Sequence, residues 1–225
     1  MKKIQCLNHG HVGLFESMGS DLSIIRNARV SFDAEWRTGE DSDKDEKLLR
    51  YLLRNRHTSP FEAVTFTFDV RCPIFVARQW HRHRTWSYNE VSARYAELPA
   101  DYYVPELQDI TTQSTSNKQA RTDEQHPQAS GLQTLIIEGC EAAIQTYRDL
   151  LAAGCPRELA RGVLPVNTYT HFFATVNLHN LFHFLRLRLH PHAQREMRVY
   201  ARALLELISD VVPVSARLFH ELENV

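Results

Sequence analysis

The stretch that decides the fold is Val64-Thr-Phe-Thr-Phe-Asp-Val70, which continues as Arg71-Cys-Pro73. Its side chains alternate strictly, with two valines and two phenylalanines on one face, which is typical of a strand buried on one side. Proline suits the first position of a helix, so we predict a helix over Pro73–Trp86. A strand that leads directly into a helix indicates a fold that mixes both elements.

The same patterns predict elements on either side of this centre. Upstream we expect strands at Ile4–Leu7 and Val12–Met18 and helices at Leu22–Ala28 and Lys44–Arg56. Downstream we expect helices at Gly131–Ala153, Pro156–Val163, Leu178–Leu189 and Pro191–Val212, and an aromatic-rich strand at Thr168–Val176. Residues 109–130 are rich in Thr, Ser, Gln and Asn, which predicts a mobile loop. We therefore expect one mixed α+β domain over residues 1–225, with an antiparallel-type sheet flanked by helices.

Composition places the chain among ordinary soluble proteins. Of its 225 residues 43% are apolar and 24% are charged, and the formal net charge is -1. This balance gives no general attraction to nucleic acid or to an anionic membrane, and we expect neither as a partner. The four cysteines are scattered without CxxC spacing, and Met1–Cys6 lacks the apolar stretch of a signal peptide. A cytoplasmic protein with isolated thiols is the expectation.

Cations are concentrated in Gln79–Tyr95, just after the predicted strand. Arg78, Arg82, Arg84 and Arg94 lie in or next to this segment, together with two histidines. On the predicted helix Arg78 and Arg82 share a face, and like charges at that spacing repel by about 0.2–0.5 kcal/mol. Guanidinium groups bind phosphate in a bidentate way, which suits a nucleotide or a dinucleotide. A solvated basic face paired with acidic neighbours such as Glu90 and Glu97 is an equally open interpretation of the composition.

The order of residues resembles that of a known family. Arg82-His83-Arg84, with Ser92 after seven further residues and Arg94 beyond it, is similar to the signature motif of flavin-dependent thymidylate synthases. The matching landmarks elsewhere, in the order of the chain, are Arg29–Phe32, His57–Glu62, Pro156–Arg161, Leu164–Asn167 and His192–Gln194. Because these matches cover nearly the whole chain, the resemblance is specific.

The resemblance implies an enzyme that methylates dUMP to dTMP. It implies FAD as cofactor, NADPH as reductant, 5,10-methylenetetrahydrofolate as carbon donor, and a homotetramer with sites at subunit interfaces. The residues that it assigns to FAD are Ser59, Arg82, His83, Arg84, Glu90, Asn177, His179 and His183. The residues that it assigns to dUMP are Gln79, Trp80, His81, Arg82, Glu90, Val91, Ser92, Ala93, Arg94, Arg161 and Arg188.

Arg188 is our candidate catalytic residue, because a cation beside N3 of the pyrimidine favours the ionised ring. None of the cysteines lies in a recognisable nucleophile setting. Ser92 lacks a partner base in the sequence and is better suited to hydrogen bonding with dUMP. From spacing alone, Arg161 would pair with Glu158, and Arg188 would be a cation at a helix C-terminus. Only the resemblance favours the nucleotide roles.

Three positions depart from the common family pattern. His179 stands where many members have Arg, and His183 where a different polar residue, often Asn, is usual. A neutral imidazole does not replace a guanidinium in a phosphate clamp, so FAD is expected to bind differently or more weakly. Ala93 replaces a common Gly, which requires a negative φ.

Two other classes of function account for part of the sequence. A metal enzyme would use His179 and His183, four residues apart, or His190 and His192, but no further ligand is evident, and we expect no metal site. A nucleotide- or RNA-binding module without catalysis accounts for the arginines and the nearby aromatic residues. Only a flavoprotein would be yellow, which separates it from both alternatives.

Overall fold

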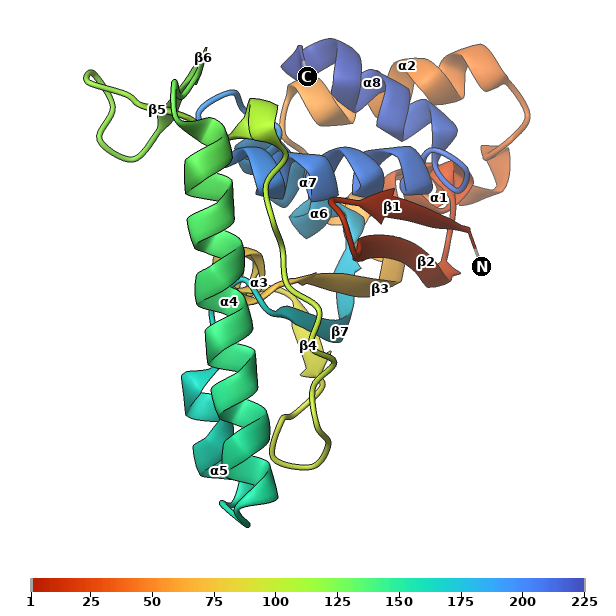
Figure 1. Ribbon diagram of the computed structural model, residues 1–225. Helices are drawn as coiled ribbons and strands as arrows, with labels where there is room; N and C mark the ends of the chain where they lie inside the picture. The colour runs from red at the N-terminus through yellow and green to blue at the C-terminus, as the bar shows by residue number, and fades with distance from the viewer. Residues whose placement is uncertain (1, 225) are drawn as a thin grey trace.

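A five-stranded antiparallel sheet lies at the centre of the computed structural model, which describes residues 2–224 (Figure 1). Its strand order is β1-β2-β3-β7-β4, and a separate two-stranded hairpin is formed by β5 and β6. The strands of the large sheet are β1 (Lys3–Cys6), β2 (Gly10–Met18), β3 (Thr65–Pro73), β4 (Ser87–Glu90) and β7 (Tyr169–Asn177). The predicted α+β class is confirmed, and the four strands predicted from the sequence are all present within a few residues.

Strands β3 and β7 form the centre of the sheet. They pair over nine positions, from Thr65 opposite Asn177 to Pro73 opposite Tyr169. The side chains of β3 alternate between the two faces of the sheet, as predicted. Phe66, Phe68 and Val70 are fully buried on one face. Thr67 points to the other face, where its hydroxyl lies 2.9 Å from that of Thr175 on β7.

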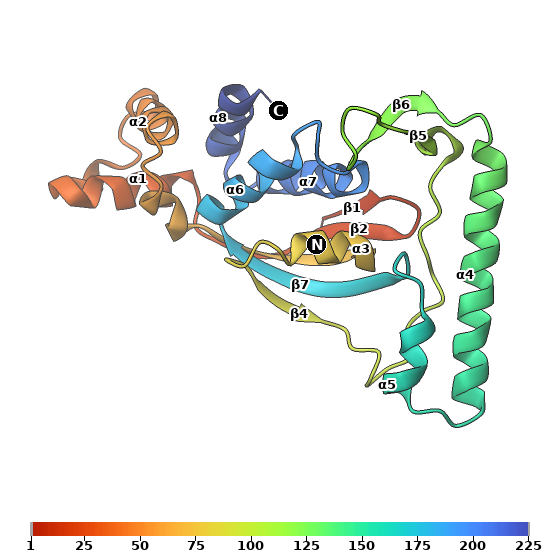
Figure 2. The same cartoon turned by 90° about the vertical axis from the view of Figure 1, so that its left-hand side faces the viewer.

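Helices cover only one face of the sheet. Figure 2 shows α6 and α7 stacked over it, with α1, α2 and α8 beyond them at one end. The helices are α1 (Asp21–Arg29), α2 (Ser42–Arg54), α3 (Ile74–Trp80), α4 (Ala129–Ala152), α5 (Arg157–Ala160), α6 (Leu178–Arg188), α7 (Arg195–Ile208) and α8 (Pro213–Glu223). No helix from residues 2–224 covers the opposite face. We call that side, which carries Phe15, Thr67, Asp69, His171 and Phe173, the open face.

The helix predicted over Pro73–Trp86 is wrong in its second half. Helix α3 ends at Trp80, where the backbone N–H of His81 donates to the carbonyl of Ala77, and the chain then turns back as β4. The turn lets Trp80 and Trp86 pack edge to face in the core, with ring centroids 5.8 Å apart. Burial of both indoles outweighs the helical pattern. Arg82 lies after the end of α3, so the expected repulsion along a shared helix face with Arg78 does not arise.

The segment predicted as a mobile loop, residues 109–130, contains a hairpin of β5 (Thr111–Gln113) and β6 (Arg121–Gln125). Arg121 of β6 forms an ion pair of 2.8 Å with Glu196, a buried carboxylate of α7. Polar strands are hard to recognise from composition, because alternation of apolar side chains is the usual signal. The long helix α4 follows, and both ribbon views show it at one side of the sheet (Figures 1 and 2).

The C-terminal helices differ from expectation at their boundaries. The helix predicted over Pro191–Val212 begins at Arg195 and ends at Ile208, and Pro213 starts a further helix, α8, that was not predicted. Proline at a first helical position is favourable, so Pro213 both ends the preceding segment and begins α8.

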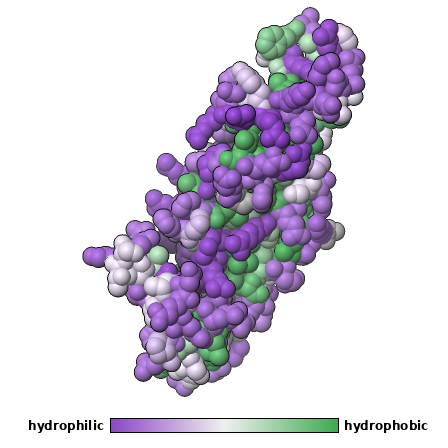
Figure 3. All heavy atoms as spheres, turned by 90° about the horizontal axis from the view of Figure 1, so that it is seen from above, coloured by the Kyte–Doolittle hydropathy of each residue, from purple (hydrophilic) through white to green (hydrophobic). Residues whose placement is uncertain are grey.

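The surface seen from above is elongated, and its hydrophobic side chains form separate patches among hydrophilic ones (Figure 3). Among the described helices, none combines the length and the apolar character needed to cross a lipid bilayer.

Candidate active site

The turn between α3 and β4 carries the arginine–histidine motif. Arg82 and Arg84 are exposed, whereas His83 between them is buried. The His83 imidazole packs against Phe184 of α6, with ring centroids 4.7 Å apart, and lies 6.2 Å from the ring of His183. The turn therefore presents two exposed cations to solvent and packs against α6 through the histidine.

Arg188, the last residue of α6, is held against this turn. Its Nε–H donates to Nε2 of His83 at 3.0 Å, and its Nη2 donates to the backbone carbonyl of Gln79 at 3.3 Å. Within residues 2–224 no carboxylate pairs with this guanidinium, although it is half-buried. Desolvation lowers its pKa from the ordinary value. A half-buried cation without a counterion favours an anionic ligand.

His83 is held in its neutral form by its surroundings. Burial first, and then the charges of Arg188 and His183, lower the pKa of His83 from 6.5 to about 4. A neutral imidazole can accept the Arg188 hydrogen bond at Nε2 only when its proton is on Nδ1. The arrangement therefore fixes one tautomer of His83 and orients the guanidinium of Arg188.

This shift predicts a pH dependence of stability. Between pH 6.5 and about 4 the unfolded chain binds a proton at His83 that the native protein does not, so stability falls as the pH is lowered. The slope due to this residue is about 1.4 kcal/mol per pH unit within that window. Urea unfolding of the wild-type protein and of His83→Gln at pH 4.5–7 measures it. The free energies of unfolding of the wild type and of His83→Gln should converge as the pH is lowered. If they changed in parallel with pH, the lowered pKa of His83 would be contradicted.

A second group of predicted residues lies where the chain leaves β4. Thr170 donates to Oε1 of Glu90 at 2.5 Å, and the Val91 N–H donates to the carbonyl of His171 at 2.9 Å. The segment after β4 then runs beside α5 (Arg157–Ala160), where Nε of Arg94 lies 4.0 Å from Oε2 of Glu158. Arg161 begins the short helix η5 (Arg161–Val163) directly after α5 and is exposed.

Two alternative roles considered from the sequence, a pair between Arg161 and Glu158 and a nucleophilic Ser92, find little support in the structure. Within the described chain no ion pair joins Arg161 to Glu158, which lies near Arg94 instead. The Ser92 hydroxyl accepts from the Arg94 N–H at 3.3 Å, and no histidine or carboxylate in residues 2–224 is bonded to it. Ala93 is buried and is not among the residues with positive φ, so the requirement placed on it by the sequence is met.

The junction of β7 and α6 carries the remaining flavin candidates. Asn177 caps α6, and its side chain accepts from the Asn180 N–H at 2.9 Å. His179 and His183 follow on the first two turns of the helix, as predicted, and His183 lies close to the His83 turn. Ser59 is the exposed first residue of η3 (Ser59–Ala63), a short helix that packs against α1 and α6.

Two predicted nucleotide contacts of the turn, Trp80 and His81, have side chains that pack against aromatic residues, and Trp80 is fully buried whereas His81 is half-buried. The ring of His81 packs against Tyr88 at 4.6 Å and Phe172 at 5.4 Å. Trp80 can therefore contribute to a ligand site in this conformation only through its backbone.

One chain divides the predicted residues between two places. Arg188 is joined to Gln79 and His83, whereas Arg94, four residues after the end of β4, approaches Glu158 of α5. No hydrogen bond or ion pair within residues 2–224 connects the two groups. The turn with α6 and the segment after β4 therefore form two separate groups of polar side chains in one chain.

Sequence reasoning missed a cluster on the open face. His11, Asp69 and His171 come from three neighbouring strands and place their polar atoms within 4.8 Å of one another. The only signal in the sequence is that each residue occupies an outward position of a strand. Strand pairing, which the sequence does not reveal, was needed to bring them together.

Comparison with known proteins gives consistent matches. The family model "Thymidylate synthase complementing protein" matches residues 13–214. A flavin-dependent thymidylate synthase of Treponema denticola is 46% identical over 99% of this chain and 84% of its own length. One from a strain of Thermus thermophilus is 45% identical over 97% of this chain and 78% of its own length. The UMP/dUMP methylase PolB from Streptomyces cacaoi, solved with 5-Br dUMP, has a TM-score of 0.87 and 36% identity, with 97% of each chain covered.

Proposed function

The chain belongs to the family of flavin-dependent thymidylate synthases, and we propose that it converts dUMP to dTMP with 5,10-methylenetetrahydrofolate as carbon donor. We further propose FAD as the flavin and NADPH as its reductant. The structural observation that carries the proposal is Arg188, a half-buried cation without a carboxylate partner among residues 2–224, oriented by neutral His83 and the Gln79 carbonyl. The four free cysteines agree with a cytoplasmic location.

The residues around the arginine–histidine turn fit FAD. Arg82 and Arg84 are exposed and form no ion pair within residues 2–224, so both are available to a pyrophosphate. Asn177, His179 and His183 add polar groups at the start of α6, where backbone N–H groups favour anions. Bound FAD would supply the two-electron reduction that turns the transferred carbon into a methyl group.

The chain's own contribution to the pyrimidine is electrostatic. C5 of uracil becomes a better nucleophile when the ring carries more negative charge. Arg188 beside N3 would favour that ionised form, because an opposite charge within about 4–6 Å stabilises a charged group. Its two hydrogen bonds to His83 and Gln79 hold the guanidinium in place before the substrate arrives, so little reorganisation is needed.

The exposed arginines of the turn are proposed to bind the FAD pyrophosphate, and Arg188 the pyrimidine, so the dUMP phosphate is expected to use cations of the other group. Ser92, Arg94 and Arg161 are suited to phosphate, but in one chain they lie beside α5, away from Arg188. We propose that a second copy supplies them, and that the enzyme is a homotetramer with its sites at subunit interfaces. The outlying helix α4 leaves a surface for such an assembly (Figure 2).

The first test of this function is the identity of the cofactor. Titration of the flavin-free protein with FAD should change the flavin spectrum and saturate at one flavin per chain. FMN, which lacks the adenosine half and the pyrophosphate, should bind at least tenfold more weakly. Arg82→Ala should weaken FAD binding by about 1.5–3 kcal/mol, the range for a hydrogen bond to a charged group.

Arg78→Ala is the matched control for this titration. Arg78 is an exposed arginine of α3 in the same segment, and it is not assigned to the flavin. Equal affinity for FMN and FAD, or no spectral change with either, would exclude the proposed cofactor. Assays with dUMP and with UMP then test the substrate, and methylation of neither would exclude the proposed reaction.

A further inference from the structure

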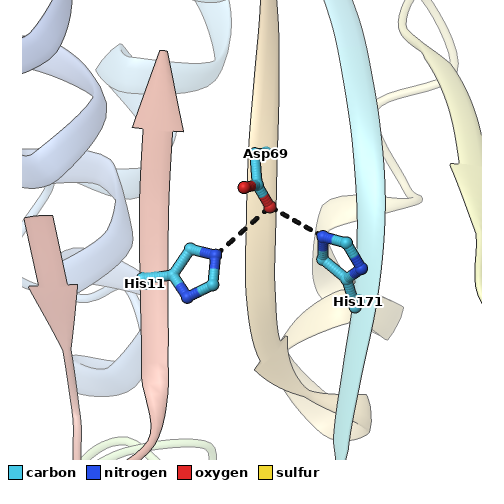
Figure 4. A group of neighbouring side chains, drawn as sticks. All are labelled: His11, Asp69 and His171. Carbon is cyan, nitrogen blue, oxygen red and sulfur yellow. Dashed lines mark hydrogen bonds and ion pairs between the residues drawn. The ribbon is translucent and has the colours of Figure 1, made fainter. Parts of the chain in front are cut away.

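Three strands of the open face bring two histidines and one aspartate together (Figure 4). Asp69 of β3 lies between His11 of β2 and His171 of β7. Nε2 of His11 is 3.2 Å from Oδ1 of Asp69, and Nε2 of His171 is 2.7 Å from the same oxygen. In the sheet register both histidines stand opposite Arg71, two positions from Asp69. Because side chains two positions apart share a face, the register itself creates the cluster.

We propose that His11, Asp69 and His171, none of which is assigned to the nucleotide or the flavin, form a binding site for a first-row divalent transition-metal ion such as Zn²⁺. Two imidazole nitrogens and a carboxylate oxygen are a common ligand set for such ions. In a tetrahedral site, ligand atoms about 2.0–2.2 Å from the ion are themselves about 3.3–3.6 Å apart. The 3.2 Å distance from His11 to Oδ1 is close to this range, whereas the 2.7 Å distance from His171 is shorter, so the His171 imidazole has to move away by some tenths of an ångström. All three ligand atoms already lie within 4.8 Å of one another, so small side-chain rotations complete the set.

The carboxylate of Asp69 is largely enclosed by groups that favour its negative charge. Its side chain is only 7% exposed, and the Lys3 ammonium and the His11 and His171 imidazoles all lie within hydrogen-bond distance of its oxygens. A cation bound here would take over these contacts to the carboxylate.

The cluster opens on one side to a hollow of about 320 Å³. Val91, Tyr169 and Thr170 also line this hollow. Three protein ligands leave at least one coordination position free, as in catalytic rather than structural zinc sites. A water molecule or a small ligand has room there. Val91 and Thr170 connect the hollow to Glu90 and the segment after β4.

Lys3 is the main competitor for the ion. Its Nζ lies 2.7 Å from Oδ2 of Asp69 and 3.3 Å from Nε2 of His11. The alternative to a metal site is therefore an ion-pair network in which the ammonium takes the place of the cation. Lys3 lies on the edge strand β1 with a side chain 38% exposed, so it can turn to solvent when an ion binds. The other nearby cation, Arg71, is paired with Asp101 and does not reach Asp69.

The test is metal binding by the full chain. After chelator treatment and dialysis, Zn²⁺ is titrated by competition with a chromophoric chelator, and Co²⁺ is titrated by its visible absorption. We expect one ion per chain and a loss of affinity of more than tenfold in His11→Gln/His171→Gln. The control His190→Gln/His192→Gln removes two exposed imidazoles that also lie close together, with ring centroids 4.8 Å apart, and should bind as the wild type does.

The Lys3→Met variant is expected to change the Zn²⁺ affinity in the opposite direction, by raising it. This result can be obtained whether or not the histidine variants fold. Removing the competing ammonium should tighten Zn²⁺ binding at least threefold. If the cluster were only an ion-pair network stabilised by Lys3, the substitution would not raise its affinity for Zn²⁺. Circular dichroism and melting curves establish that each variant is folded. Three outcomes overturn the proposal: no ion bound by the wild type, unchanged binding in His11→Gln/His171→Gln, or weaker binding in Lys3→Met. None of these readouts depends on flavin or dUMP.

Discussion

Arg188→Ala is expected to lower dTMP formation by about 10²–10³-fold, the usual effect of losing one well-placed electrostatic contact to a transition state, about 2.7–4 kcal/mol. NADPH-driven reduction of the flavin should remain largely intact, because Arg188 is assigned to the pyrimidine. The two rates are measured on the same preparation, as NADPH oxidation and as dTMP production. Their ratio separates a role at the nucleotide from a general loss of structure.

Two further variants sharpen this experiment. Arg188→Lys should recover only part of the rate, because an ammonium cannot donate to both His83 and the Gln79 carbonyl in the same planar arrangement. Arg186→Ala is the matched control, since Arg186 is two positions away on α6 and forms an ion pair of 2.7 Å with Glu223 instead. If Arg188→Ala lost NADPH oxidation and dTMP production equally and kept a native circular dichroism spectrum, the assignment of this arginine to the pyrimidine would be wrong.

Two inactive variants are expected to restore each other's activity when they share a tetramer. Arg94→Ala should also lower dTMP formation, by about 10–100-fold, because it removes a charge-assisted contact to phosphate. If Arg188 and Arg94 of one site come from different chains, hybrids of the two variants contain some sites with both arginines. Random pairing of equal amounts gives about one quarter of the sites intact, so activity should rise to about a quarter of that of the wild type.

Co-expression with two different affinity tags isolates these hybrids. The control is the same hybrid made from wild type and Arg188→Ala/Arg94→Ala, which tests whether tagging or assembly changes activity by itself. If both arginines of a site came from one chain, every site in the Arg188→Ala and Arg94→Ala hybrid would lack one of them. Activity no higher than that of the single variants would therefore exclude a shared site, and so would a fully active monomer in light scattering.

The sequence predicts most of this fold where packing follows a simple period. Strand β3 and helix α6 were recognised because their apolar side chains repeat at two and at about 3.6 residues. The turn at 81–86 was missed because its aromatic residues also fit a helix, and only the packing of Trp80 against Trp86 shows why the chain reverses there. The β5–β6 hairpin was missed for the opposite reason, because its strands carry almost no apolar pattern.

The candidate site was accessible from the sequence only through the family resemblance. Spacing suggested a helix-end cation for Arg188, and the structure places it at the end of α6, yet its contact to His83 joins residues 105 positions apart. Similarly, no local pattern links His11 to Asp69 and His171. Tertiary contacts between distant segments decide both clusters, and a single sequence carries no record of them.

The β3–β7 pairing at the centre of the sheet also determines how this protein must fold. Thr67 and Thr175, bonded across the two strands, are 108 positions apart in sequence. Closing a loop of that length costs about 4 kcal/mol of chain entropy before any contact compensates for it, so the central pair is expected to form late and slowly. During synthesis at about 5–20 residues per second, β3 waits roughly 5–20 s for β7 to leave the ribosome. Over that interval its unpaired hydrogen-bonding edge is open to other nascent chains, and we expect yields of soluble protein to depend on chaperones and on the speed of translation.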